Sequence, residues 1–158
     1  MSTLTLHLPD ADATERAGAR LAPCLHGGMV VSLGGDLGTG KTTLVRGLLH
    51  ARGVRGPIKS PTYALVEHYE LSSLYFYHFD FYRFMSTDEW DAAGMSDYFR
   101  DDCVCIVEWP ERVRDRLPLP DIELSLSYPA SGPGRQLEAH SRSPAGEQCL
   151  KRLAGASG

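Results

Sequence analysis

The stretch Gly35-Asp36-Leu37-Gly38-Thr39-Gly40-Lys41-Thr42 decides the fold of this chain, because it matches the phosphate-loop pattern G-x-x-x-x-G-K-[ST] at every defined position. The run before it, residues 29–33, is short, apolar and β-branched, and it predicts a buried strand. The run after it, residues 43–49, spaces leucine and valine four apart, which predicts the apolar side of a helix. Strand, loop and helix in this order are the context that a phosphate loop requires.

The residue types of this loop suit a bound triphosphate. Gly35, Gly38 and Gly40 let the backbone turn tightly and bring its N–H groups close to phosphate oxygens. The following helix adds the positive end of its dipole to the same anion site. Lys41 supplies a full charge to the outer phosphates, and the Thr42 hydroxyl is placed to ligate Mg²⁺. A glycine-rich turn that merely carries Lys-Thr is the alternative, and the matching flanks disfavour it.

Size and charge limit the class of protein. A chain of 158 residues with 42% hydrophobic residues predicts a single folded domain over residues 1–158, with residues 155–158 as a frayed tail. The net charge of −4 disfavours a protein that holds DNA or RNA by itself. We expect no membrane association and a cytoplasmic location, because no run approaches the ~20 apolar residues of a membrane span and the N-terminus lacks signal-peptide features.

Four cysteines are present without a C-x-x-C pair, and we expect buried reduced thiols in preference to a metal site or a disulfide.

The remaining elements are predicted from hydrophobic periodicity and from capping and turn residues. Further strands are expected over residues 3–8, 64–69, 74–79, 104–108, 122–128 and 135–139, and further helices over residues 13–24, 86–94, 111–117 and 144–153. Together they predict an α/β class, single-domain P-loop NTPase fold with a central mixed, mostly parallel sheet flanked by helices.

Two predicted strands end in a carboxylate. Asp80 follows the apolar run 74–79 and is a candidate for holding Mg²⁺ or positioning water, although a helix cap or a partner for Arg83 is an alternative. Glu108 ends the apolar run 104–107, and a phosphate-loop fold requires an acid facing Mg²⁺ from the strand beside its first strand. The segment 53–63, which carries Ser60 and Thr62, is either a γ-phosphate-sensing switch or an ordinary surface loop.

These motifs and their spacing resemble the bacterial TsaE family, the ATPase component of tRNA threonylcarbamoyladenosine biosynthesis. The resemblance covers nearly the whole chain, and Thr39, where alanine is common, is one small departure. It rests on the phosphate loop and on Asp12-Ala13-Thr14 with Gly18, Ser60-Pro61-Thr62-Tyr63, His78-x-Asp80-x-Tyr82-Arg83, Asp97-Tyr98-Phe99 and Val107-Glu108-Trp109-Pro110-Glu111.

The resemblance implies an ATPase that works with the TsaD and TsaB proteins and meets tRNA only through that complex. It implies that Thr14 lies near the adenine, that Thr42 and Glu108 hold Mg²⁺, and that Asp80 is needed for hydrolysis. It further implies a switch at Ser60, Pro61, Thr62 and Tyr63, a packing or partner-facing role for Trp109, and phosphate contacts from Leu37, Gly38, Thr39, Gly40, Lys41, Thr42 and Thr43.

The residues themselves favour ATP over GTP, because no guanine-reading N-K-x-D motif is present. No arginine finger is evident in the sequence, so we expect slow hydrolysis alone and faster hydrolysis with a partner. A small-molecule kinase is an alternative that the absence of a convincing lid disfavours. A nucleotide-dependent switch without hydrolysis is a further alternative, disfavoured by the intact Lys41, Thr42, Asp80 and Glu108.

Overall fold

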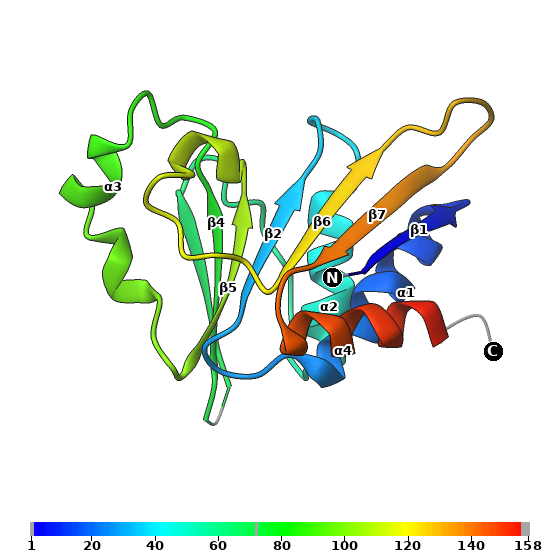
Figure 1. Ribbon diagram of the computed structural model, residues 1–158, viewed down its shortest axis with the longest axis horizontal. Coiled ribbons are helices and arrows are strands. Elements are labelled where there is room, and N and C mark those ends of the chain that lie inside the picture. The colour runs from blue at the N-terminus through cyan, green and yellow to red at the C-terminus, as the bar shows by residue number, and fades with distance from the viewer. Residues whose placement is uncertain (1, 72, 156–158) are drawn as a thin grey trace.

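The structure is a computed structural model that describes residues 2–71 and 73–155. Its strands form one seven-stranded sheet in the order β1-β7-β6-β2-β5-β4-β3 (Figure 1). The strands are β1 (Thr3–Leu8), β2 (Val30–Gly34), β3 (Val66–Glu70), β4 (Tyr75–Asp80), β5 (Cys103–Glu108), β6 (Ile122–Ser127) and β7 (Arg135–Ser141).

The sheet is mixed, but the expectation that it is mostly parallel is wrong. Three pairings are parallel (β2 with β5, β2 with β6, and β4 with β5), and three are antiparallel (β1 with β7, β3 with β4, and β6 with β7). Short connections join β3 to β4 and β6 to β7, and a short connection forces neighbouring strands to run in opposite directions. The parallel strands are therefore confined to the centre, where the phosphate loop leaves the sheet.

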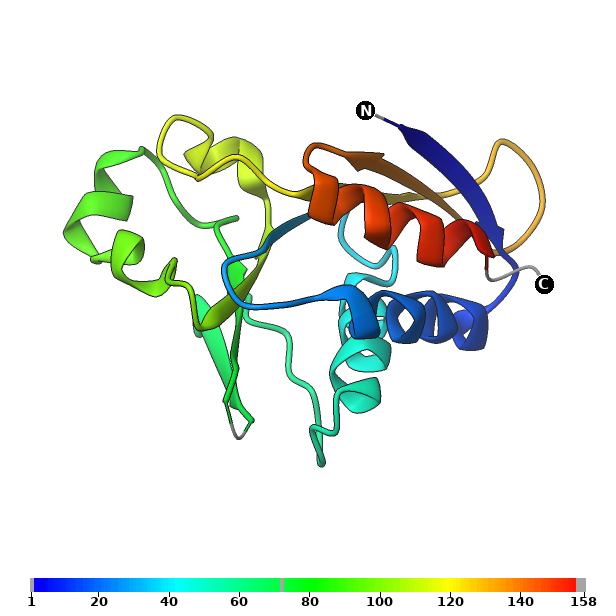
Figure 2. The same cartoon turned by 60° about the horizontal axis from the view of Figure 1, so that its bottom comes forward.

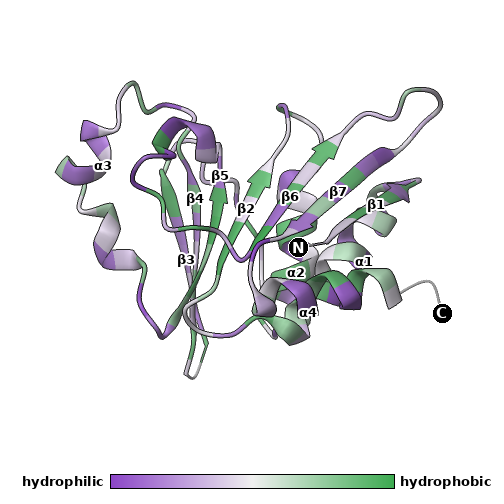
Figure 3. Cartoon of the chain, viewed as in Figure 1, coloured by the Kyte–Doolittle hydropathy of each residue, from purple (hydrophilic) through white to green (hydrophobic). Residues whose placement is uncertain are grey.

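The helices lie on both faces of the sheet. The long helices α1 (Ala11–Leu21), α2 (Lys41–Ala51) and α4 (Pro144–Ala154) pack on one face, with the short 3₁₀ helix η1 (Ala22–Cys24) after α1 (Figure 2). The opposite face of β4 and β5 is covered by α3 (Asp88–Ala92) and the 3₁₀ helices η2 (Met95–Tyr98) and η3 (Pro110–Val113). Hydrophobic residues follow the central strands between these two layers (Figure 3).

A close contact between α1 and α2 places the start of α1 beside the phosphate loop. A Cβ at Gly18 of α1 would lie 2.0 Å from the Leu44 carbonyl oxygen, and one at Gly47 of α2 would lie 1.9 Å from the Glu15 carbonyl oxygen. Only glycine at both positions lets the two helix backbones approach this closely. The contact brings Thr14, one turn before Gly18, next to the start of α2, where a Cβ at Gly40 would lie 3.6 Å from Thr14 Cγ2.

Other local predictions agree with the structure except at one helix. The helix expected over residues 111–117 is a single 3₁₀ turn, η3, after which the N–H groups of Arg116 and Leu117 both donate to the Val113 carbonyl. Pro118 and Pro120 follow and leave no room for a longer helix. Ser72 of the expected hairpin turn and residues 156–158 of the expected frayed tail lie outside the described residues.

All four cysteines are free; Cys103, Cys105 and Cys149 are buried as expected, whereas Cys24 is half-buried. No helix in the part of the chain that the structure describes is both long and apolar enough to cross a membrane.

Candidate nucleotide-binding site

The phosphate loop connects the end of β2 to the start of α2. Its three glycines have positive φ angles, 134° at Gly35, 81° at Gly38 and 104° at Gly40. At Gly35 the space is also restricted, because a Cβ would lie 2.5 Å from the Leu126 carbonyl oxygen. Glycine is therefore required here both by backbone conformation and by the adjacent strand β6.

Lys41 is buried at the first turn of α2 and its ammonium group points into the loop. Its Nζ atom donates to the Gly35 carbonyl oxygen at 2.6 Å, lies 3.4 Å from Glu108 Oε1, and sits 4.6 Å from the centroid of the Trp109 ring. The loop thus holds an ammonium group at its centre, where it can exchange a backbone carbonyl for a phosphate oxygen.

The Glu108 carboxylate lies between the side chains of Lys41 and His78. His78 Nε2 lies 2.5 Å from Glu108 Oε2, and both side chains are buried. Burial raises the pKa of Glu108, but the hydrogen bond and charge of His78 and the charge of Lys41 outweigh it, so this pKa lies below its ordinary value. Glu108 is accordingly an ionised carboxylate, as a metal ligand must be.

Asp80 lies beside Glu108 because of the strand register. The two residues are paired positions at the carboxyl ends of the parallel strands β4 and β5, and Leu33 of β2 is paired with Glu108 on the other side. The Asp80 carboxylate accepts hydrogen bonds from Thr62 Oγ1 at 3.0 Å and from the Tyr82 N–H at 2.8 Å. The backbone N–H of Tyr82 fixes the direction of the carboxylate.

The segment 60–63 reaches the site through hydroxyl groups. Ser60 Oγ lies 2.8 Å from Thr62 Oγ1, which in turn donates to Asp80. Tyr63 is 83% exposed, and the Arg83 guanidinium lies 4.3 Å from the centroid of its ring. Hydrogen bonds therefore connect this segment to Asp80, while Tyr63 in the same segment is exposed to solvent.

Most of the predicted site residues line one cavity of about 300 Å³. Its lining combines the loop, the start of α2, the segment after α2 and both strand ends: Leu37, Gly38, Gly40, Lys41, Thr42, Thr43, Ser60, Thr62, Asp80 and Glu108. Pro61, Tyr63 and Trp109 do not line it. Trp109 instead packs against Tyr82, with ring centroids 4.8 Å apart, and covers Lys41.

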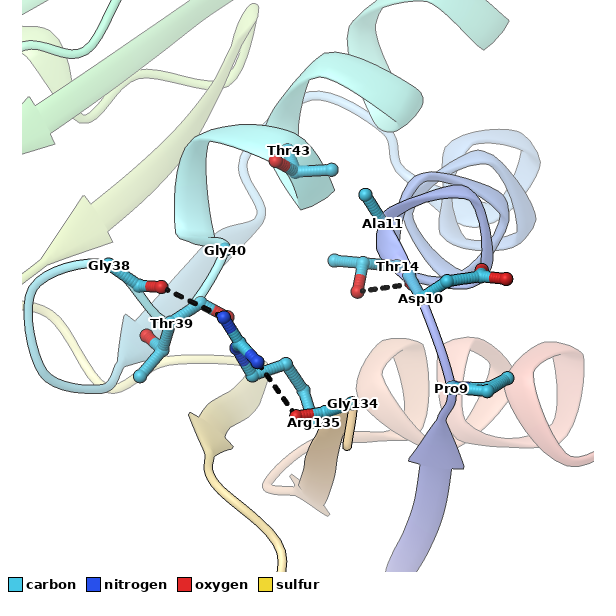
Figure 4. Close-up of a pocket in the computed structure, with 10 residues that line it drawn as sticks. All are labelled: Pro9, Asp10, Ala11, Thr14, Gly38, Thr39, Gly40, Thr43, Gly134 and Arg135. Carbon is cyan, nitrogen blue, oxygen red and sulfur yellow. Dashed lines mark hydrogen bonds between the residues drawn. The ribbon is translucent and has the colours of Figure 1, made fainter. Parts of the chain in front are cut away.

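A second cavity of about 250 Å³ adjoins the first and shares Gly38, Gly40 and Thr43 with it (Figure 4). The start of α1 forms one side, with Asp10 capping the helix through the Ala13 N–H at 2.8 Å, and the phosphate loop forms the other. Thr14 and Thr39 line this cavity. Its position beyond the loop, away from Asp80 and Glu108, suits a nucleoside attached to the phosphates.

Arg135 closes this second cavity and was not predicted. Its guanidinium donates to the carbonyl oxygens of Thr39 at 3.1 Å and Gly38 at 3.3 Å (Figure 4). It also lies 4.5 Å from the centroid of the Tyr128 ring. The contact with the phosphate loop joins residues 96 and 97 positions apart, so no local pattern could reveal it. His78 was also missed as a site residue, although a polar residue within an apolar strand, two positions before Asp80, was a usable signal.

The residues present fit a magnesium–nucleotide complex. The described residues contain no group of three or more His, Cys, Asp or Glu side chains that could hold a metal by themselves. The carboxylates of Asp80 and Glu108 line the first cavity, together with four residues that carry hydroxyl groups: Thr42, Thr43, Ser60 and Thr62. Mg²⁺ in proteins is commonly held by one or two such oxygens together with phosphate oxygens and water, so this donor set suits a metal that arrives with its nucleotide.

The chain is similar in sequence to proteins of one family. Residues 8–137 match the family model for the threonylcarbamoyl adenosine biosynthesis protein TsaE. A tRNA threonylcarbamoyladenosine biosynthesis protein TsaE from Haemophilus influenzae is 41% identical over 133 residues, covering 81% of this chain and 84% of its own length. The protein of the same name from Synechocystis is 38% identical over 116 residues, covering 71% and 73% of the two chains.

A crystal structure of YdiB from Bacillus subtilis has the same fold, with a TM-score of 0.83 over 99% of this chain and 97% of that chain at 24% sequence identity. The likeness between these two structures concerns the fold alone, whereas the family model covers the loop and both strand-end carboxylates. The chain therefore belongs to the TsaE family.

Proposed function

We propose that this protein binds and hydrolyses Mg²⁺·ATP as an accessory component of tRNA threonylcarbamoyladenosine biosynthesis, acting with the TsaD and TsaB proteins. The pathway is the one that the relatives' names state, and membership of the family supports it. The hydrolytic activity is inferred from the site.

One observation carries the proposal of hydrolysis. Lys41 in the phosphate loop lies 3.4 Å from Glu108, and Glu108 is paired in register with Asp80. An ammonium group, the Thr42 hydroxyl and two carboxylates thus line one cavity, and a second cavity of about 250 Å³ shares Gly38, Gly40 and Thr43 with it. Phosphoryl transfer requires positioning and charge neutralisation, and these groups supply both.

Each side chain has a separate task in this proposal. Lys41 turns from the Gly35 carbonyl to the outer phosphates, and the loop amides bind their oxygens. Thr42 and Glu108 hold Mg²⁺, which when bound neutralises charge on the phosphates. Asp80, held by the Tyr82 N–H and Thr62, orients the attacking water. Thr62 thereby couples the switch segment to the group that acts on water.

The same lining supports a dependence on a partner. None of the described residues that line the first cavity is an arginine. Because an arginine supplied by a partner can raise phosphoryl-transfer rates by about 10³-fold or more, the isolated protein should hydrolyse ATP slowly. Contact with the TsaD–TsaB pair should then raise the rate, either by supplying a charge or by ordering residues 60–63.

The test is the release of inorganic phosphate from Mg²⁺·ATP by the full chain, alone and with TsaD and TsaB. We expect slow release alone, a higher rate with both partners, and transfer to water only. Absence of phosphate release under both conditions, with ATP bound, would leave a nucleotide-dependent binding module as the function.

A further inference from the structure

Two thiols outside the nucleotide site lie side by side although they are 125 positions apart in the chain. Cys24 ends η1, and Cys149 lies in the middle of α4. Their Sγ atoms are 2.7 Å apart. This separation is shorter than a contact between unbonded sulfur atoms and longer than the disulfide bond of about 2.05 Å. No disulfide joins the two cysteines, so the geometry is that of two free thiols in direct contact.

The two thiols have different surroundings. Cys24 is half-buried and therefore reachable from solvent, whereas Cys149 is fully buried. The hydrogen bond with Cys149 lowers the pKa of the Cys24 thiol, and the nearby charges of Arg152 and Arg52 lower it further against the effect of burial. The hydrogen bond with Cys24 and burial raise the pKa of the Cys149 thiol.

The backbone around Cys24 is also held in place. Arg52 of α2 donates from the same Nη1 atom to the carbonyl oxygens of Ala22 at 2.9 Å and Leu25 at 3.0 Å, on either side of Cys24. The Cys24 Sγ atom contacts the Leu21 carbonyl oxygen at 3.0 Å. A fixed, accessible thiol next to a guanidinium and a buried second thiol is the arrangement typical of a redox-sensitive pair.

We propose that Cys24 and Cys149 form an intramolecular disulfide when the protein meets a hydroperoxide. The Cys24 thiolate attacks one peroxide oxygen, the O–O bond breaks, and Cys24 becomes a sulfenic acid while the released hydroxide or alkoxide takes a proton. Cys149 then attacks the Cys24 sulfur, the S–O bond breaks, and the leaving hydroxide takes the Cys149 proton as water. Two thiols are oxidised and one peroxide is reduced.

The other two cysteines provide an internal comparison. Cys103 and Cys105 lie on one face of β5, and both are buried. Burial raises the pKa of each of these thiols. The charge of Arg100 lowers the pKa of both thiols against burial, but neither thiol has the solvent access of Cys24, so the proposal assigns oxidation to the Cys24–Cys149 pair only.

The bond would join the segment after α1 to α4 at the end of α1 away from Thr14. It should therefore stabilise the fold with little change in nucleotide binding. Closing a loop of this length removes conformational entropy from the unfolded chain, which raises the denaturant concentration at the unfolding midpoint.

The experiment treats the full chain with a small excess of hydrogen peroxide, removes the peroxide, unfolds the protein and counts free thiols. We expect two of the four thiols to disappear, a mass loss of two hydrogens, and a non-reducing peptide map that links the Cys24 peptide to the Cys149 peptide. A reductant should restore all thiols and the original unfolding midpoint.

Matched variants make the assignment specific. Cys24→Ser, at the half-buried position, should lose the disulfide and the shift in midpoint, and Cys103→Ala should keep both. Survival of all four thiols at peroxide concentrations that oxidise free cysteine, a Cys103–Cys105 link, or only a bond between two molecules would overturn the proposal. Because the readouts are covalent, these outcomes do not depend on ATP hydrolysis.

Discussion

His78 and Glu108 face each other across neighbouring strands with 2.5 Å between Nε2 and Oε2, and both are almost fully buried. No hydrogen-bond partner is present for His78 Nδ1 among the described residues. The hydrogen bond of the imidazole ring to Glu108 is made through Nε2. The contact leaves Glu108 Oε1 facing Lys41. His78 is therefore positioned to orient the carboxylate that we assign to Mg²⁺.

Replacing His78 should weaken the metal site more than the nucleotide site. Groups that orient metal ligands commonly contribute about 10–100-fold to metal affinity or activity. We expect His78→Ala to raise the Mg²⁺ concentration needed for half-maximal ATP hydrolysis about 10-fold, and His78→Gln, which keeps a donor, to lose less. His68→Ala, an exposed histidine on β3, is the control. An unchanged Mg²⁺ dependence in His78→Ala would limit His78 to packing.

Lys41→Ala should abolish steady-state hydrolysis, with a loss on the order of 100-fold or more, because it removes the only ammonium group lining the first cavity in the described structure. Phosphate release at saturating Mg²⁺·ATP is the measurement. Lys59→Ala is the matched control, since Lys59 is exposed and does not line this cavity. A Lys41→Ala rate equal to that of the unaltered protein would refute the role of Lys41.

Asp80→Ala should reduce turnover far more than nucleotide affinity. Asp80 is held by Thr62 and the Tyr82 N–H rather than by the phosphate loop, so its loss leaves the phosphate contacts in place. Calorimetry with Mg²⁺·ATP should show an affinity close to that of the unaltered protein, whereas the hydrolysis rate should fall strongly. Asp88→Ala, at an exposed acidic position, is the control for both measurements. Equal losses of affinity and rate would make Asp80 structural.

Arg135→Ala should weaken ATP binding about 10-fold, because two charge-assisted hydrogen bonds to the phosphate loop are lost. The rate at saturating ATP should change less, since Arg135 does not line the cavity that holds Asp80 and Glu108. Arg142→Ala removes an exposed arginine whose partner is Glu123, at 2.8 Å, and should leave the affinity unchanged. A fall in the saturated rate without a change in affinity would contradict this assignment.

Glu108 should make stability depend on pH in the acid range. Its pKa in the folded protein lies below the ordinary value of 4.5, so its contribution is fully present above that value and is lost as the pH falls toward the folded pKa. In urea titrations, the free energy of unfolding of the unaltered protein minus that of Glu108→Gln should be constant near neutral pH. Below about pH 4.5 this difference should decrease, because the unaltered protein loses stability that the variant does not. Glu111→Gln, at an exposed position, should follow the unaltered protein throughout.

The sequence by itself determined the parts of this protein that depend on local order along the chain. The phosphate loop was evident because its glycines, Lys41 and Thr42 act within one strand–loop–helix unit. Asp80 and Glu108 were predicted as candidates because each is an acid at the carboxyl end of an apolar strand, where ligands bind in open α/β sheets. The strands themselves followed from the period of their side chains.

Tertiary structure alone decided how distant segments meet. Strand order and direction depend on pairings between remote segments, and the two antiparallel hairpins made the sheet less parallel than expected. Arg135 reaches the phosphate loop only because β7 pairs with β6 next to β2. Cys24 meets Cys149 only because α4 packs against η1 and α1. Such contacts arise from packing of the whole core, which no local periodicity encodes.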